Sequence, residues 1–155
     1  MQSWQLRLLT RFAHVYFAFS RGMTLGVRAA CFDEEGRVFL VMHSYLPGWH
    51  FPGGGLDRDE TAVEGLVREL KEEGNLELTK PPALVQVYYN RGTSRRDHVI
   101  FFRCEGVRQE RPKRADLEIA AAGFFALDAL PEETTSSTRR RLAELAGTAA
   151  PDSFW

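Results

Sequence analysis

The pattern of hydrophobic and polar positions along this 155-residue chain changes period from segment to segment. Short runs that are apolar throughout, or that alternate with polar residues, are typical of strands. Such runs predict strands at residues 23–32, 37–43, 49–51, 83–89, 98–103 and 123–127. The polar turn residues between the first two runs, and those between 83–89 and 98–103, predict two hairpins.

Two further segments have the period of an amphipathic helix. The first follows residues 59–61, which supply helix-start side chains, and its inner face is formed by Ala62, Gly65, Leu66 and Leu70. The second spans residues 135–146, with Leu142 and Leu145 inward. This order of elements predicts an α/β fold, an α/β/α sandwich in which a mixed β-sheet carries helices on both faces. We expect residues 147–155 to form a loop whose final aromatic pair docks on the body.

Residues 1–21 form a separate segment in front of the domain at 22–155. Apolar side chains recur there at helical spacing, with arginines off that stripe: Trp4, Leu8, Phe12, Val15 and Phe19. We expect an amphipathic helix that packs on the domain or on a second subunit of a homodimer. A membrane-surface helix is the alternative. The segment is too short and too charged to span a membrane, and no clean cleavage site marks it as a signal peptide.

The overall composition is that of a soluble globular protein of one domain, with 44% hydrophobic and 26% charged residues. A formal net charge of −1 produces no global field that would attract nucleic acid or a membrane, so we expect neither as a partner. Cys31 and Cys104 lie in apolar strand-like runs. We therefore expect buried free thiols, as suits a cytoplasmic protein.

Three carboxylates are grouped on the first predicted helix. Glu69, Glu72 and Glu73 are spaced i, i+3 and i+4, so they share one helix face. Like charges this close repel, and the helix gains nothing from grouping them unless a cation binds there. Oxygen ligands of this kind suit Mg²⁺ or Mn²⁺, which bind through a few carboxylates together with substrate phosphates. The spacing therefore indicates a metal site that acts on a phosphate-bearing substrate.

The segment from Gly54 to Leu76 resembles the Nudix box, G-x5-E-x7-R-E-U-x-E-E-x-G-U, in which U is aliphatic. Eight positions match at every spacing: Gly54, Glu60, Arg68, Glu69, Leu70, Glu72, Glu73 and Leu76. One position departs, because Asn75 stands where the pattern has its last glycine, directly after Gly74. Asparagine is the non-glycine residue best suited to a left-handed helix stop, so we expect the ligands to be kept. With the flanking strand pattern, the resemblance extends over roughly residues 22–146.

The Nudix resemblance implies a fold and a set of roles. The box would form a loop–helix–loop at the edge of a sandwich, and Mg²⁺ or Mn²⁺ would be held by Glu69, Glu72 and Glu73, with Glu73 central to catalysis. Glu60 and Arg68 would orient the loop and the helix through an ion pair. Gly54 would supply either a backbone shape or a carbonyl that faces the metal.

The resemblance also implies a fourth carboxylate in the loop before the last strand, as a metal ligand or as the general base. Glu118, six residues before Phe124, is our candidate, and Asp116 is its competitor.

The substrate implied is a small molecule, a nucleoside diphosphate linked to another moiety, cleaved at the diphosphate with the help of metal and a carboxylate base. Three arginines of the second hairpin link could hold its phosphates, or be a solvated loop tip: Arg91, Arg95 and Arg96. Tyr45 and Trp49 could stack a base, although packing suits Trp49 equally. We expect His43 and His50 at the pocket rim.

Two other functions remain open. An RNA 5′-end pyrophosphohydrolase is the alternative enzyme, and the neutral pI with few basic clusters weighs against it. A nucleotide-binding Nudix regulator without catalysis is the alternative from another class. Such regulators usually lose a box carboxylate, whereas this chain keeps all three.

Overall fold

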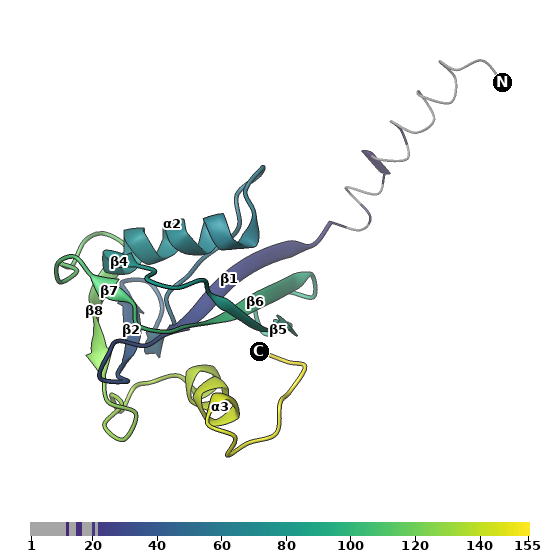
Figure 1. Ribbon diagram of the computed structural model, residues 1–155. Helices are drawn as coiled ribbons and strands as arrows, with labels where there is room; N and C mark the ends of the chain where they lie inside the picture. The colour runs from purple at the N-terminus through teal and green to yellow at the C-terminus, as the bar shows by residue number, and fades with distance from the viewer. Residues whose placement is uncertain (1–11, 13–14, 17–19, 21) are drawn as a thin grey trace.

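The computed structural model describes residues 12, 15, 16, 20 and 22–155 (Figure 1). Most of the predicted helix at 1–21 lies outside the described residues, so its packing and the homodimer stay predictions. The elements follow in the order β1 (Thr24–Cys31), β2 (Val38–His43), β3 (Trp49–His50), α2 (Ala62–Gly74), β4 (Leu76–Glu77), β5 (Ala83–Tyr89), β6 (Asp97–Cys104), β7 (Arg108–Gln109), β8 (Ile119–Phe125) and α3 (Ser136–Leu145). None of the described helices is long and apolar enough to cross a membrane.

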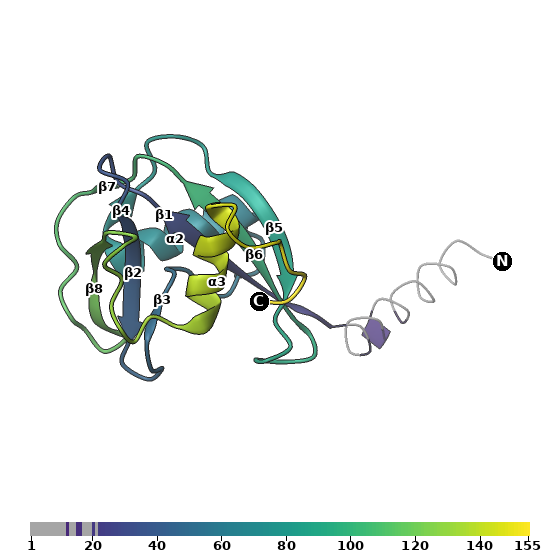
Figure 2. The same ribbon diagram turned by 90° about the horizontal axis from the view of Figure 1, so that it is seen from below.

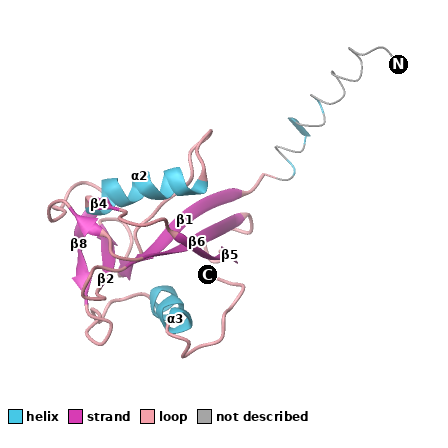
Figure 3. Cartoon of the chain, viewed as in Figure 1, coloured by secondary structure: helices cyan, strands magenta, loops and turns pink. Residues whose placement is uncertain are grey.

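The strands form two three-stranded sheets and a small ribbon. One sheet has the order β1-β6-β5, the other β3-β2-β8, and β4 pairs with β7. Strand β1 runs parallel to β6, while β5 and β6 are antiparallel, which makes that sheet mixed. Helix α2 lies on one side of the strands and α3 on the other (Figures 1 and 3). The predicted α/β class with helices on both faces is confirmed, with the strands divided between two sheets.

The first predicted hairpin is wrong. A turn does join β1 to β2, but only one bridge, Phe32 to Val38, links the two strands. One edge of β1 pairs along its whole length with β6. Its other edge faces residues 52–55, the glycine-rich loop, where the amide of Val27 donates to the carbonyl of Gly54 at 2.8 Å. Strand β2 is occupied by β3 and β8. Both edges of β1 and both edges of β2 are therefore occupied by other segments, which leaves no edge for a β1–β2 hairpin.

The second predicted hairpin is confirmed, since β5 and β6 pair antiparallel. The last strand starts earlier than predicted, at Ile119 instead of 123, because Ile119, Ala121 and Ala122 also pair with β2. Residues 105–117, predicted as loop, contain β7. This earlier start puts Glu118 directly before β8, at the sheet edge.

Two groups of buried side chains make the core. The group under α2 includes Val27, Phe39, Leu66 and Leu70, and the group under α3 includes Leu40, Phe51, Tyr88 and Phe101. Residues that alternate along β1 and β2 serve the two groups in turn, as the pleat of a strand buried on both faces requires. Cys31 and Cys104 are register partners in β1 and β6 and are buried free thiols, as predicted.

Helix α2 has well-formed ends. Thr61 caps the first turn in a capping box with Glu64, whose carboxylate accepts from the Thr61 amide at 2.7 Å. Asn75 ends the helix in the left-handed region, with φ 51°. Gly74 keeps a helical conformation, and a Cβ there would lie 2.7 Å from the Phe39 ring. Asn75 therefore takes the stop position of the pattern's glycine, while Gly74 is required by close packing.

The C-terminal residues dock on the body, as predicted. The amide of Trp155 donates to the carbonyl of Tyr89 at 3.2 Å, and its ring lies 5.4 Å from that of Phe101. The guanidinium of Arg141, fully buried in α3, donates to the carbonyl of Phe154 at 2.6 Å. Figure 2 shows the chain end lying between α3 and β5.

Candidate active site

The first turns of α2 are tied to the loop that precedes them. Arg68 donates through Nη2 to Glu60 Oε1 at 2.7 Å and to the carbonyl of Gly55 at 3.0 Å. The same Glu60 oxygen accepts from the amide of Asp57 at 2.6 Å. The hydrogen bond from Arg68, and secondly that from the Asp57 amide, holds the pKa of Glu60 below its ordinary value. These contacts fit the structural roles expected for Glu60 and Arg68, because they fix the loop on the helix.

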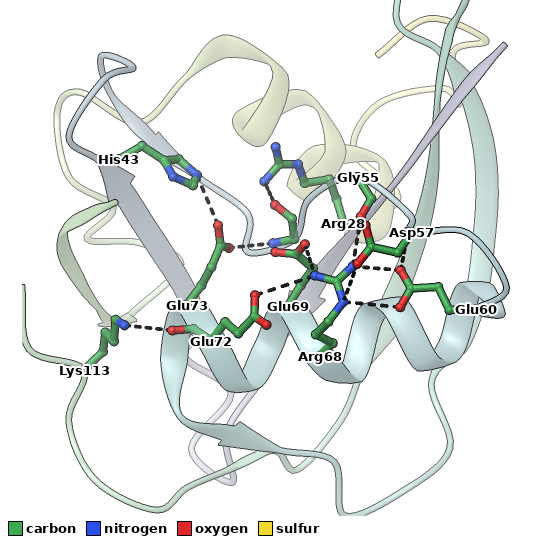
Figure 4. A network of polar contacts seen from close by, with 11 residues as sticks. Arg28, His43, Gly55, Asp57, Glu60, Arg68, Glu69, Glu72, Glu73 and Lys113 are labelled. Atoms are coloured by element: carbon green, nitrogen blue, oxygen red, sulfur yellow. Dashed lines mark hydrogen bonds and ion pairs between the residues drawn. The ribbon is translucent and has the colours of Figure 1, made fainter. Parts of the chain in front are cut away.

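The three box glutamates differ in their surroundings. Glu69 and Glu73 are buried, with 8% and 3% of their surface exposed, while Glu72 is exposed. Glu73 Oε2 accepts from the amide of Gly53 at 2.7 Å, and Glu69 Oε1 accepts from Arg68 Nη1 at 2.7 Å. Figure 4 shows the Glu69 and Glu73 side chains converging on the glycine-rich loop. Glu72 directly precedes Glu73 on the helix, and its Oε2 atom lies 3.6 Å from Arg68 Nη1.

Glycine is required where the loop meets both β1 and the glutamates. A Cβ at Gly54 would lie 2.5 Å from the Glu69 carboxylate, and one at Gly53, where φ is 134°, would lie 2.0 Å from the carbonyl of Val27. The Gly54 carbonyl itself accepts from the Val27 amide. Of the two roles expected for Gly54, the structure therefore displays the backbone shape, which brings the loop against the carboxylates.

Glu118 joins the box from outside. One carboxylate oxygen of Glu118, one of Glu73 and a ring nitrogen of His43 all lie within 4.8 Å of one another. Its competitor Asp116 shapes the loop instead, accepting from the amides of Ile119 at 2.7 Å and Glu118 at 2.9 Å. These bonds, with one from Lys113, lower the pKa of Asp116 to about 2. The geometry thus favours Glu118 as the carboxylate that completes the site.

The sequence suggested that His43 lies at the pocket rim, but in the structure this side chain is buried. It is 4% exposed, and neither ring nitrogen has a hydrogen-bond partner among the residues that the structure describes. Its Nε2 is 3.5 Å from Glu73 Oε1, beyond ordinary hydrogen-bond length. Burial, then the charges of Arg28 and His50, lower the pKa of His43 to about 4. The sequence did contain one sign that His43 is buried near the site: it ends an apolar strand that leads to the box.

Arg28 is a site residue that sequence reasoning missed. It is in the middle of β1, and its guanidinium donates to the carbonyl of Phe51 at 3.2 Å and to that of Gly53 (Figure 4). The signal was one cation inside an otherwise apolar strand, which is costly to bury unless it is hydrogen-bonded. Through these hydrogen bonds Arg28 holds the glycine-rich loop against β1, and it brings a positive charge to the site.

The electrostatics of the buried carboxylates fit a divalent cation. Burial raises the pKa of Glu73 to about 7, against the opposing effects of the Gly53 amide and Arg28. Burial also raises the pKa of Glu69, chiefly opposed by Arg68. Buried carboxylates are stable as anions only when a positive charge compensates them. Two buried carboxylates, a third at the rim and an imidazole nitrogen form a donor set suited to such an ion.

A cavity of about 500 Å³ lies beside this cluster. Arg28 and Gly54 belong to its wall. Other parts of the wall come from β1, the second hairpin, α3, the segment around β3 and the C-terminal residues, including Leu25, His50, Phe51, Asn90, Thr93, Thr138 and Trp155. It combines apolar walls with a few polar side chains, as small-molecule sites do.

The five residues predicted to bind substrate lie in different settings. Tyr45 is exposed beside His43, with ring centroids 5.2 Å apart. Trp49 packs edge-on against Phe125 at 4.8 Å, which fits the packing alternative. The Arg91 guanidinium stacks over the Phe154 ring at 4.4 Å. Of the hairpin link, the cavity wall includes Asn90 and Thr93 and none of the arginines 91, 95 and 96.

Comparison with known proteins agrees with this architecture. A family model described as the NUDIX domain matches residues 22–145. A solved MutT NUDIX hydrolase from Burkholderia pseudomallei is 26% identical, with a TM-score of 0.66 over 79% of this chain and 97% of that one. An ADP-ribose pyrophosphatase from Streptococcus suis is also 26% identical, with a TM-score of 0.60 over 83% and 96% of the two chains.

Among curated proteins the similarity is local. An RNA pyrophosphohydrolase of Xanthomonas campestris is 49% identical over 43 residues, which cover 28% of this chain and 21% of that protein. One of Stenotrophomonas maltophilia is 46% identical over a stretch of the same length. This chain therefore matches about a fifth of the length of these relatives.

Proposed function

This chain belongs to the NUDIX domain family, and on that premise we propose that it is a hydrolase of pyrophosphate bonds that cleaves the diphosphate of a nucleoside diphosphate linked to another moiety. The observation that carries the proposal is the contact between two features. Gly54 and Arg28 line the cavity of about 500 Å³; Gly54 also lies against the Glu69 carboxylate, and the charge of Arg28 acts on Glu73. A molecule whose nucleoside occupies the cavity therefore has its diphosphate beside the carboxylates.

The residues that would hold Mg²⁺ or Mn²⁺ are Glu69, Glu72, Glu73 and Glu118, with the backbone of the loop at Gly54 beside them. When bound, such an ion offsets the charge of the diphosphate and makes a coordinated water more acidic. Within the cluster, Glu118 is the exposed carboxylate and Glu73 the buried one. This difference suits Glu118 to exchange protons with solvent and Glu73 to carry a charge that a cation neutralises.

The protein's own part in the reaction is to position groups and move one proton. The Glu118 carboxylate takes a proton from a water that attacks phosphorus, a bond from phosphorus to the bridging oxygen breaks, and two phosphorylated products leave. If Glu118 serves only as a ligand, Glu73 is the alternative base. Arg28, held by the carbonyls of Phe51 and Gly53, contributes positive charge near the phosphates.

For the organic part of the substrate, we propose that Tyr45 stacks at the exposed rim beside His43. Arg91, Arg95 and Arg96 stand at the tip of the β5–β6 hairpin, where they would meet phosphates only if the substrate extends past the cavity. Trp49 would act through packing.

A second candidate, hydrolysis at an RNA 5′ end, is favoured by one specific feature. A cavity of about 650 Å³ is lined by the basic residues Arg111, Lys113 and Arg114. Lys113 Nζ donates to the backbone carbonyl of Glu72 at 2.8 Å, so this loop is attached to the box helix. A longer anionic substrate would find positive charge there. Curated relatives with local similarity carry the name of this activity.

The experiment that separates these candidates is a hydrolysis assay on a substrate panel with Mg²⁺ and with Mn²⁺, in which the phosphorylated products are separated and quantified by chromatography. We expect turnover of nucleoside diphosphate derivatives, little turnover of 5′-triphosphorylated RNA, and loss of both in Glu73→Gln. Glu105→Gln, which changes an exposed glutamate at the end of β6, is the matched control and keeps the wild-type rate. A preference for RNA would make hydrolysis at RNA 5′ ends the leading candidate. Binding of nucleotides without any cleavage would contradict both enzymatic candidates and indicate a nucleotide-binding regulator.

A further inference from the structure

The imidazole of His43 is the most unusual polar group of the site. It is almost completely buried, yet neither of its nitrogens has a hydrogen-bond partner within the described part of the chain. Buried polar atoms without a partner are rare and costly, and where they occur a ligand or ion often supplies the missing contact. The ring lies in a polar surrounding, with Glu73, Tyr45 and His50 as neighbours.

The neighbouring groups do not satisfy the ring. Glu73 Oε1 is 3.5 Å from Nε2, and Glu73 already accepts a hydrogen bond from Gly53 through its other oxygen. The ring of His50 is 5.9 Å away, and its Nε2 lies 2.9 Å from the carbonyl of Pro47. The Nε2 atom of His43 therefore faces the Glu73 carboxylate at ion-pair distance without a hydrogen bond to it (Figure 4).

The spacing is close to that of ligands around one ion. Two ligand atoms that are each about 2.1 Å from a cation are about 3 to 4 Å apart, depending on the angle between them. The atoms of His43, Glu73 and Glu118 lie within 4.8 Å of one another, and the closest pair described is at 3.5 Å. A small contraction around an ion would complete the set.

We infer that His43 is a nitrogen ligand of the cation site formed with Glu73 and Glu118, and that it makes this site favour a transition-metal ion over Mg²⁺. The inference rests on the proposed function only in assigning these two carboxylates to a metal. An all-oxygen site suits Mg²⁺, whereas an imidazole nitrogen binds first-row transition ions such as Mn²⁺, Co²⁺ or Zn²⁺ more strongly.

The direct test is pulsed electron paramagnetic resonance of the chelator-stripped protein, residues 1–155, after addition of one equivalent of Mn²⁺, without substrate. We expect a ¹⁴N coupling to the bound Mn²⁺, replaced by a ¹⁵N coupling when the histidines are labelled with ¹⁵N. Because this measurement uses the wild-type chain, it does not depend on any variant folding. A wild-type spectrum of bound Mn²⁺ without nitrogen coupling would overturn the inference.

Two variants assign the coupling and measure its effect. His43→Gln should lose it, while His50→Gln, the matched neighbouring histidine, should keep it; the opposite result would also overturn the inference. Calorimetric titration with Co²⁺ and Mg²⁺ alone should show the preference for Co²⁺ falling at least about tenfold in His43→Gln. An unchanged preference would refute the selectivity.

The outcome is independent of the substrate. If the panel assay finds no hydrolysis but nitrogen coupling is present, the proposed function fails and His43 is still a ligand. If hydrolysis is found and the coupling is absent, the function stands and His43 has another role.

Discussion

At the scale of single residues, the site consists of acidic groups in surroundings that do not favour their charge. Glu73 is buried against the glycine-rich loop, and one amide and the more distant Arg28 are its main compensation. Such a group is costly without a cation and stabilised with one. Arg68, in contrast, already neutralises Glu60 and part of Glu69. The negative charge that no neighbouring cationic side chain balances is therefore concentrated at Glu73 and Glu118.

Glu73→Gln should lose most hydrolytic activity. In the presence of chelator, the metal-free variant should be at least as stable as the metal-free wild type. The folded pKa of Glu73, about 7, is above its ordinary value of 4.5, so its burial costs nothing below pH 4.5 and costs most above pH 7. One pKa unit is worth about 1.4 kcal/mol, so the full cost is on the order of 3 kcal/mol. Urea unfolding in chelator at pH 5 and pH 8 should show the advantage of the variant growing with pH. A large loss of stability at pH 8 would point to a structural role.

Glu118→Gln should lower kcat by roughly 10²–10⁴-fold with little change in metal affinity if Glu118 is the base. If it is only a ligand, the metal concentration for half-maximal activity should rise and added metal should restore part of the rate.

Asp116→Asn is the control for Glu118, because Asp116 hydrogen-bonds to backbone amides of its own loop. We expect its kcat to stay within about tenfold of wild type. If Asp116→Asn loses most of its kcat while Glu118→Gln keeps the wild-type kcat, Asp116 and not Glu118 is the carboxylate of the site.

At the scale of elements, the loop and helix of the box behave as one unit. The capping box at Thr61, the Arg68–Glu60 pair and the Asn75 stop fix both ends of α2 and the loop before it. The glycines keep that unit pressed against β1. The carboxylates thus project from a rigid helix, which favours a defined ligand geometry.

Asn75→Gly should change the unfolding free energy by less than about 0.5 kcal/mol, since both residues accept positive φ, whereas Asn75→Ala should cost about 1 kcal/mol. Gly74→Ala should cost more than either, because the added methyl group would meet the Phe39 ring. Thermal or urea unfolding of the three variants measures this order. If Gly74→Ala is the mildest, the two adjacent positions have exchanged roles.

The elements also show what the sequence could predict. The box helix, its end and the β5–β6 hairpin depend on local patterns, and their prediction is confirmed. The pairing of β1 with β6 depends on strands some 70 residues apart, as Thr24 with Asp97, which no local pattern encodes. The same reason explains the missed residues. His43 and Arg28 become site residues only when the fold brings β2 beside Glu73 and β1 beside the glycine-rich loop, whereas the box glutamates follow from spacing alone.

At the scale of the whole molecule, α3 and the chain end form one wall of the cavity. Trp155 packs on the second core group and also lines the cavity. The stability of the body and the shape of the substrate site are thereby linked through the last residue of the chain.

Trp155→Ala should therefore lower stability by about 2 kcal/mol and raise KM, with metal affinity unchanged. The ring contacts of Trp155 with Phe51, Tyr88 and Phe101 are lost, and the cavity that Trp155 lines is enlarged. Phe154→Ala, which removes a more exposed ring, is the matched control with smaller effects on both. Melting temperature and steady-state kinetics measure the two effects. A normal KM in a destabilised Trp155→Ala would confine the residue to packing.

The central claim is that the cluster around Glu73 is a metal-dependent site of pyrophosphate hydrolysis. It is tested most directly by the initial rate on the best substrate of the panel, measured against free metal concentration for wild type and Glu73→Gln. We predict that the wild-type rate is negligible in excess chelator and rises to saturation with metal, while the variant stays roughly 10²-fold or more below it at saturating metal. Full wild-type turnover in excess chelator, or a variant that keeps more than about half the rate, would contradict the account.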